Sequence, residues 1–260
     1  MKDLKNIKII VAYDGTNYYG WQRQKYKQTI QGIIEDTLRN LTGEREIKLN
    51  GSGRTDAGVH AVGQVANFVT KTSIPVDKLP NILNHKLPGD IIIKHAQKVN
   101  MKFHARYDAR SKLYHYYVMN RVYGEDTLTA KHVFLRNYCY FFNRNLNIDK
   151  MRKVADFLIG YHDFSSLSCL NQKRCKQVKN KEREIKKISI WKRHQLICFS
   201  LEADAFLYKM VRIIIGTLID FSIKQREPNE IIQILKNKDS QKSGQVIPPN
   251  GLYLMKVKYK

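Results

Sequence analysis

The same order of predicted strands and helices occurs twice along this chain of 260 residues. Short apolar or alternating runs predict strands, and a 3.6-residue apolar period predicts helices. In the first part the expected strands lie at 7–13, 46–49, 64–70 and from 91, and the helices at 29–43 and 76–87. In the second part strands are expected at 113–119, 185–191, 196–203 and 252–257, and helices at 149–159, 206–223 and 229–236. The long segments of both parts thus follow the order β-α-β-β-α-β.

This order is that of the ferredoxin-like fold. We therefore predict an α+β chain of two ferredoxin-like halves, residues 1–104 and 105–260, whose sheets flank a basic central cleft. No stretch rich in Pro, Gly and Ser separates the halves, so we expect them to pack closely. A cleft between two such halves is the natural place for a functional site.

Positive charge dominates the chain, with 46 Lys and Arg against 23 Asp and Glu, a formal charge of +23. Nucleic acid and anionic membrane are the usual partners of such a surface. The segment 172–194 has ten basic and two acidic residues, which alone would be typical of a solvated charged face. It has no amphipathic period, which argues against membrane, and the chain's 15 tyrosines favour nucleic acid because aromatic rings stack on bases. We take as candidate RNA contacts the cations Lys173, Arg174, Lys176 and Lys179.

Several classes of protein are excluded or disfavoured. No apolar stretch approaches the roughly 20 residues of a membrane span, and the first residues, MKDLKN, do not form a signal peptide. We therefore expect a cytoplasmic protein in which the four cysteines, Cys139, Cys169, Cys175 and Cys198, are reduced. No zinc-ligand spacing and no flavin or dinucleotide motif occurs, so we predict neither a metal nor a cofactor.

The loop at 50–61 has the densest concentration of candidate functional residues. Its glycines hold Arg54, Thr55 and Asp56 on a tight connection between two expected strands. The loop lacks P-loop spacing, which disfavours triphosphate binding. An aspartate beside glycine is most often a turn former, but Arg54 two residues away allows the loop to present an acid and a cation together to a polynucleotide.

The string GSGRTDAGVHA at 51–61 resembles the signature of the tRNA pseudouridine synthase A family, whose nucleophilic aspartate stands in Arg-Thr-Asp. Nearly the whole chain follows this resemblance. Further motifs similar to the family's occur in the right order at 13–24, 29–31, 103–106, 112–116, 206–216 and 247–252. The resemblance implies isomerisation of uridine to pseudouridine in the anticodon stem-loop of tRNA, on the two-half fold predicted above.

The resemblance also implies roles for individual residues. Asp56 is the nucleophile or a base at the ribose, and Arg212 forms an ion pair with it across the cleft. Tyr114 stacks on the uracil and is a candidate for proton transfer. Arg54 holds the RNA backbone or keeps the target base flipped out. The family also implies a homodimer, with RNA, and in particular tRNA, as the substrate.

Two departures from the family pattern lie in or beside the basic segment. Leu167 stands where an aromatic residue is common, and Lys181–Ile185 replaces Thr-x-Arg-x-Ile. They leave the catalytic residues intact and bear on which uridines are modified. Three alternatives remain open beside the tRNA reaction. These are the same chemistry on another RNA such as ribosomal RNA, a non-catalytic RNA-binding protein, and a nucleoside hydrolase or base glycosylase. The presence of Asp56, Tyr114 and Arg212 together argues against a non-catalytic protein.

Overall fold

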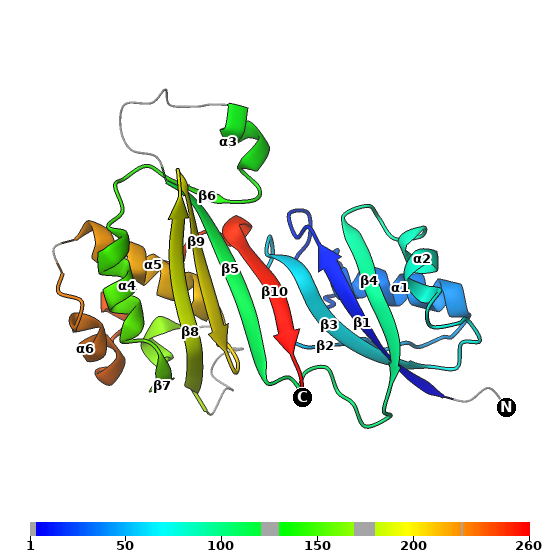
Figure 1. Ribbon diagram of the computed structural model, residues 1–260. Helices are drawn as coiled ribbons and strands as arrows, with labels where there is room; N and C mark the ends of the chain where they lie inside the picture. Colours follow the sequence, from blue (N-terminus) through cyan, green and yellow to red (C-terminus); the bar gives the residue numbers. More distant parts are fainter. Residues whose placement is uncertain (1–3, 121–129, 169–179, 225) are drawn as a thin grey trace. The chain divides into compact units, whose positions relative to one another are not determined.

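Helices and strands are interspersed along the chain, and the ten strands among the described residues pair mainly antiparallel (Figure 1). The computed structural model describes residues 4–120, 130–168, 180–224 and 226–260. Within these residues the six α-helices are α1 Ile30–Thr42, α2 Leu79–Asn84, α3 Ala130–Leu135, α4 Ile148–Asp156, α5 Met210–Ile223 and α6 Glu230–Lys236. The strands are β1 Lys5–Tyr13, β2 Asn50–Gly51, β3 His60–Thr70, β4 Ile91–Val99, β5 Ser111–Asn120, β6 Tyr140–Phe142, β7 Gly160–Asp163, β8 Glu182–Arg193, β9 Leu196–Ala203 and β10 Leu252–Lys258. The predicted α+β class is confirmed.

The chain folds into two compact units. Unit 1 comprises the described residues up to Arg110 together with Tyr253–Lys260, and unit 2 comprises Ser111–Leu252. The C-terminal strand thus returns to the unit that contains the N-terminus. The division into two ferredoxin-like halves after residue 104 stays a prediction.

In unit 1, β1 lies between β4 and β3, and β3 also pairs with β2 and, in parallel, with β10. Alternate residues of β1, such as Ile7, Ile9 and Val11, are fully buried, as expected for a strand with one face on a core. The prediction of a strand at 46–49 is wrong. These residues are irregular, and only Asn50–Gly51 pairs with β3. Ile47 and Leu49 are nevertheless buried, and the N–H and carbonyl of Leu49 are hydrogen-bonded to the side chains of Glu35 and Gln31.

In unit 2, the strand order is β5-β9-β8-β7, with β6 pairing in parallel with β5. Helix α4 packs on both α5 and β8. The sequence did not predict α3, β6 or β7, which have six, three and four residues and are too short for a clear period.

Helix ends follow local signals where the chain has them. The Thr29 hydroxyl accepts a hydrogen bond from the Gly32 N–H at 3.3 Å, and Gly43 ends α1 in the left-handed conformation. The helix expected from Phe206 begins only at Met210, because Lys209 is left-handed with φ 59°. Helix α5 is buried around nearly its whole circumference, so it packs as a core helix of unit 2.

None of the helices among the described residues has the length and apolar character that a membrane crossing requires. Cys139 and Cys198 are buried free thiols, and burial raises their pKa to about 11 and about 12. Both therefore stay protonated near neutral pH and pack as small apolar side chains. Cys169 and Cys175 lie outside the described residues.

Candidate active site

Asp56 lies in the loop that connects β2 to β3, and its residue is half-buried. The loop is held from the side by residues 13–24. The hydroxyl groups of Tyr13 and buried Thr55 are hydrogen-bonded at 2.8 Å, and the Trp21 N–H donates to the Thr55 carbonyl at 3.2 Å. A turn closes behind the aspartate, where the Val59 N–H donates to the Asp56 carbonyl at 3.2 Å. The residue before the candidate nucleophile is thus held through both its side chain and its backbone.

Two glycines allow the segment 13–24 to approach this loop so closely. A Cβ atom on Gly15 would lie 2.0 Å from the Val59 carbonyl oxygen, and one on Gly20 would lie 2.4 Å from the Thr55 carbonyl oxygen. Gly20 also has φ +83°, a conformation that side chains other than glycine rarely adopt. The sequence analysis did not single out these glycines, because only the loop on the other side of the contact shows why they are needed.

Three aromatic residues of this segment form its core. Tyr13, Tyr18 and Trp21 are almost fully buried, and the rings of Tyr13 and Trp21 have centroids 6.0 Å apart. Burial raises the pKa of Tyr13 well above its ordinary value, although hydrogen bonds with Thr55 and Gln64 oppose the shift. The Tyr13 hydroxyl therefore stays protonated and acts as a hydrogen-bonding support for the loop, unsuited to the role of a base.

His60 follows the loop at the start of β3 and is buried. Its Nδ1 accepts a hydrogen bond from the Gly15 N–H at 3.1 Å, and its ring stacks on Tyr253 with centroids 4.7 Å apart. Asp14 Oδ1 also lies 3.1 Å from that nitrogen. The histidine thus joins β3, β10 and the segment after β1. No group of three or more His, Cys, Asp or Glu in the described parts of the chain could hold a metal ion.

Arg54 is exposed and is connected to the body of unit 1 through two glutamines that the sequence analysis missed. Its Nε donates to Gln22 Oε1 at 3.2 Å, and Gln22 Nε2 donates to Gln31 Oε1 at 2.6 Å. Gln31 Nε2 in turn donates to Glu35 Oε1 at 2.8 Å. Glu35 is buried on α1 and also accepts from the Leu49 N–H. Four residues spread over 33 positions of sequence therefore form one chain of hydrogen bonds that ends at Arg54.

Tyr114 and Arg212 both lie in unit 2 and are both buried, with exposed fractions of 7% and 9%. Tyr114 on β5 meets the ring of Phe206 edge to face, at a centroid distance of 5.2 Å. Arg212 in the first turn of α5 donates through Nε to the Ile247 carbonyl at 2.7 Å. This contact joins α5 to the segment before β10, which is the last of the motifs predicted from sequence.

Tyr116 lies two residues further along β5 and binds the same segment. Its hydroxyl donates to the Pro248 carbonyl at 2.8 Å. Burial raises the pKa of Tyr116 well above its ordinary value, while the positive charge of Arg212 opposes the shift. Arg212 and Tyr116 thus bind neighbouring carbonyl groups of the same segment, those of Ile247 and Pro248.

The predicted site residues thus fall into two groups. Arg54 and Asp56 share one loop of unit 1, while Tyr114 and Arg212 lie with the 247–250 segment in unit 2. The ion pair between Asp56 and Arg212 stays a prediction. The candidate RNA contacts Lys173, Arg174, Lys176 and Lys179 lie outside the described residues.

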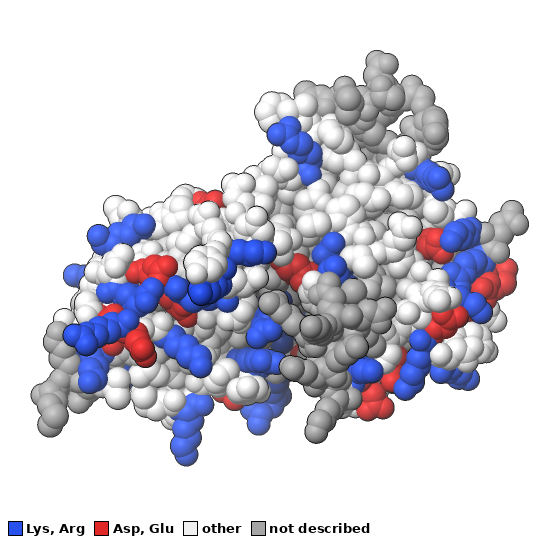
Figure 2. Space-filling model, turned by 180° about the vertical axis from the view of Figure 1, so that it is seen from behind, with Lys and Arg blue, Asp and Glu red and all other residues white. Residues whose placement is uncertain are grey.

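The rest of the basic segment is described, and it includes β8. On this strand Lys186, Lys187, Lys192 and Arg193 are exposed. Figure 2 shows that Lys and Arg side chains on the face seen from behind are widely distributed, with fewer Asp and Glu among them. The excess charge is therefore displayed to solvent over a wider area than the segment 172–194. Leu167, where the family pattern has an aromatic residue, is fully buried.

The chain is similar to known proteins over almost its whole length. A family model described as tRNA pseudouridine synthase matches residues 9–108 and 154–260. A protein of Thermoanaerobacter pseudethanolicus named tRNA pseudouridine synthase A is 43% identical over 256 residues, which cover 98% of this chain and 100% of that protein. A protein of Acetivibrio thermocellus with the same name is 40% identical with the same coverage. A protein of Clostridium tetani named tRNA pseudouridine synthase A 2 is 42% identical over 98% of this chain and 99% of its own length.

Proposed function

The chain belongs to the tRNA pseudouridine synthase family, whose members are isomerases that convert uridine to pseudouridine, and we propose that its target uridines lie in the anticodon stem-loop of tRNA. Similarity over nearly the full length of named relatives carries this proposal, because it includes both the loop of Asp56 and the helix of Arg212. In the reaction the bond between N1 and C1′ breaks, the uracil rotates, and a bond forms between C5 and C1′. C5 loses a proton and N1 gains one, so the isomerisation needs no redox partner.

Asp56 is the residue that we propose to attack the nucleotide or to act as a base at the ribose. Carboxylates are established covalent nucleophiles, provided that they are ionised. An adjacent guanidinium favours the ionised form, and Arg212 is our candidate for this cation. Its burial among apolar neighbours supports the assignment, because a buried arginine requires polar partners. The Ile247 carbonyl is one such partner, and we propose that Asp56 is another.

Tyr114 and Arg54 have supporting roles in this proposal. Extrusion of the target nucleotide from its stack costs a few kcal/mol, which contacts with the protein must offset. Tyr114 stacks on the detached uracil, and Arg54, exposed on the catalytic loop, holds the RNA backbone or keeps the base flipped out. The hydroxyl of Tyr114 is in addition a candidate for proton transfer.

We further propose that the protein is cytoplasmic and that its two halves are ferredoxin-like and flank a basic central cleft. The arrangement in unit 1 supports the proposal, since β1, α1, β2, β3, α2 and β4 occur in that order and β1 lies between β4 and β3. A homodimer is proposed from the family resemblance. A mass in solution of twice the 30.5 kDa chain is expected, and a monomeric mass would contradict it.

Tritium release from tRNA labelled at C5 of uridine tests the proposed reaction. We expect Asp56→Asn to abolish release because the amide is not a nucleophile, while RNA affinity falls much less. Asp77→Asn, at an exposed acid of unit 1, is the matched control and should keep full activity. Undiminished release by Asp56→Asn would overturn the role of Asp56, and free uracil as the product would instead indicate a hydrolase.

The substrate needs a separate experiment. Pseudouridines are mapped in tRNA and ribosomal RNA from cells with and without this protein. We expect the differences to be confined to anticodon stem-loops. A loss only in ribosomal RNA would favour the alternative substrate, and no difference in any RNA would favour the non-catalytic RNA-binding protein.

A further inference from the structure

An exposed turn in unit 1 carries an aromatic ring between two lysines. Gln24 and Lys27 form an isolated bridge at its base, and Lys25, Tyr26 and Lys27 are all exposed. Tyr26 is 91% exposed, more than any other large apolar or aromatic residue of the described chain. The ammonium group of Lys25 lies 4.8 Å from the centre of the Tyr26 ring, and that of Lys27 lies 4.5 Å from the centre of the Tyr19 ring.

The backbone at Tyr26 is unfavourable for a tyrosine. Its φ is 61°, in the left-handed region, where an ordinary residue costs roughly 1–2 kcal/mol relative to its preferred conformation. Glycine or asparagine would occupy this position more easily. A ring so exposed also contributes little to the core. The fold therefore does not explain why a tyrosine is placed here.

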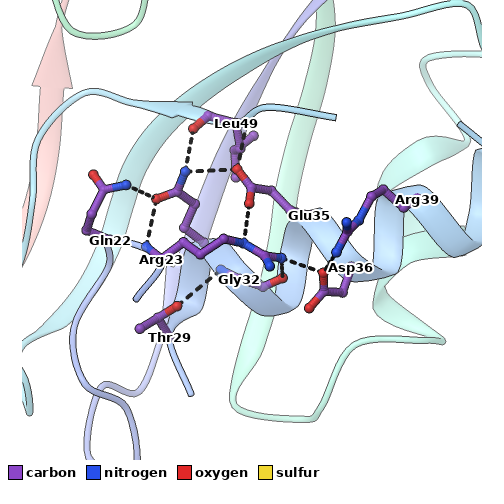
Figure 3. A network of polar contacts seen from close by, with 9 residues as sticks. Gln22, Arg23, Thr29, Gly32, Glu35, Asp36, Arg39 and Leu49 are labelled. Atoms are coloured by element: carbon purple, nitrogen blue, oxygen red, sulfur yellow. Dashed lines mark hydrogen bonds and ion pairs between the residues drawn. The ribbon is translucent and has the colours of Figure 1, made fainter. Parts of the chain in front are cut away.

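The turn is firmly anchored at its base (Figure 3). Arg23, the residue before it, donates to Glu35 Oε2 at 2.6 Å, to the Gly32 carbonyl at 2.9 Å and to Asp36, which also pairs with Arg39. Gln24 Nε2 donates to the Tyr19 carbonyl at 3.0 Å, and the Tyr19 N–H donates to the Gln28 carbonyl at 2.9 Å. The acids near the turn, Glu35 and Asp36, are thus paired with arginines of the network, so the tip presents positive charge.

The same network connects the turn to the loop of Asp56. Glu35 binds both Arg23, at the base of the turn, and Gln31, which leads through Gln22 to Arg54. The tip and Arg54 are therefore two cationic elements that are connected to α1 through shared side chains. A polyanion bound at Arg54 would meet the turn as a preorganised second contact.

We propose that the Gln24–Lys27 turn is an RNA subsite, in which the Tyr26 ring stacks on an unpaired base and Lys25 and Lys27 contact the adjacent phosphates. Alternating aromatic and basic side chains on a fixed backbone are the combination that binds single-stranded RNA. The subsite deepens the proposed function and rests on it, since it grips the same RNA beside the catalytic loop.

Substitution of Tyr26 tests the stacking. We expect Tyr26→Ala to raise KM for tRNA about 5- to 150-fold with little change in kcat, because the removal of one stacking interaction weakens binding by that order. Tyr26→Phe should behave as the wild type. The matched control is Tyr161→Ala, since Tyr161 is also an exposed tyrosine but donates to Glu182 at 3.1 Å and should not contact RNA. An unchanged KM for Tyr26→Ala, or an equal rise for Tyr161→Ala, would overturn the subsite.

Tyr26→Gly separates binding from a structural role. Glycine relieves the unfavourable φ, so the variant should have an unchanged or higher Tm. The RNA subsite nevertheless predicts that its KM rises as for Tyr26→Ala. A lower Tm with unchanged KM would show that the tyrosine serves the fold and would contradict the proposal.

The two lysines are tested through the salt dependence of RNA binding. Lys25→Gln and Lys27→Gln should each reduce the log–log slope by about 0.7, the value for one phosphate contact on a single strand. Lys78→Gln, at another exposed lysine of unit 1, should leave the slope unchanged. If neither variant alters the slope and the two lysines instead support binding to anionic vesicles, the partner of the turn is a membrane surface and the RNA subsite is wrong.

Crosslinking tests the subsite by a measurement that does not depend on turnover. Photoactivated tRNA containing 5-bromouridine, bound to the Asp56→Asn variant, should crosslink to Tyr26. If the wild type forms pseudouridine but no crosslink to the turn appears, the subsite is wrong and the proposed function stands. If the crosslink forms but the wild type makes no pseudouridine, the proposed function is wrong and the turn remains an RNA contact.

Discussion

At the scale of single residues, the loop of Asp56 is positioned partly by two glycines, whose lack of a side chain allows the neighbouring backbone to approach it closely. Gly15 and Gly20 leave room for the carbonyl groups of Val59 and Thr55, and Thr55 is then held by Tyr13 and Trp21. A candidate nucleophile gains little from the right chemistry if its loop can move by an ångström. The opening motif of the chain thus serves chiefly to position the loop.

Gly15→Ala tests this positioning. The added Cβ would meet the backbone oxygen of Val59 at 2.0 Å, and the clash should lower the free energy of unfolding by about 1–3 kcal/mol and reduce kcat. Gly89→Ala is the matched control, because nothing lies within 4 Å of its added Cβ, and it should change stability by less than about 0.5 kcal/mol. Urea unfolding and tritium release measure both effects. Equal behaviour of the two variants would contradict the close-packed loop.

At the scale of elements, helix α5 is important for the segment that follows it as well as for Arg212. Gly216, one turn after Arg212, packs against the Gln245 backbone, and the Gly244 N–H donates to Thr217 Oγ1 at 2.9 Å. These contacts bring Ile247 to the position where its carbonyl accepts from Arg212. The apolar period of the helix predicted its burial, but the segment 244–247 has no regular pattern that could predict this contact.

Gly216→Ala should displace that segment. Alanine favours a helix over glycine by about 1 kcal/mol, but its Cβ would lie 2.0 Å from the Gln245 carbonyl oxygen. We expect lower stability and a fall in kcat of about tenfold or more, because Arg212 loses its alignment. Gly43→Ala is the control: its left-handed φ should cost about 1–2 kcal/mol of stability without altering kcat. Full activity of the Gly216→Ala variant would show that the position of the segment 244–247 does not affect the reaction.

At the scale of the whole molecule, the charge of +23 governs how RNA is attracted more than what is done to it. Neutralising Lys173, Arg174, Lys176 and Lys179 should reduce the log–log salt slope of RNA binding by about 0.7–0.9 for each phosphate that the variant no longer binds. As a control, Lys224, Lys238 and Lys242 are changed to Gln. Each of these lysines is paired with an aspartate, so the slope should change little. An unchanged slope in the first variant would indicate a solvated charged face.

Much of this protein was predictable because its signals are local. The ends of α1 follow from Thr29 and Gly43, the strand at Leu196–Ala203 from its apolar pattern, and the family from short motifs in a fixed order. These features depend on neighbouring residues, whose spacing the chain itself displays. The sequence alone thus determined the α+β class and the family, while Asp56, Tyr114 and Arg212 are the site residues that it predicts.

Only the tertiary structure decided which residues far apart in the sequence lie together. The chain from Glu35 through Gln31 and Gln22 to Arg54 and the return of Tyr253–Lys260 to unit 1 join positions far apart in sequence. The same is true of the close approach of Gly15 to Val59, and the exposure of Tyr26 likewise depends on the folded chain. Polar side chains and glycines carry no periodic signal, and their partners become defined only when the backbone has folded.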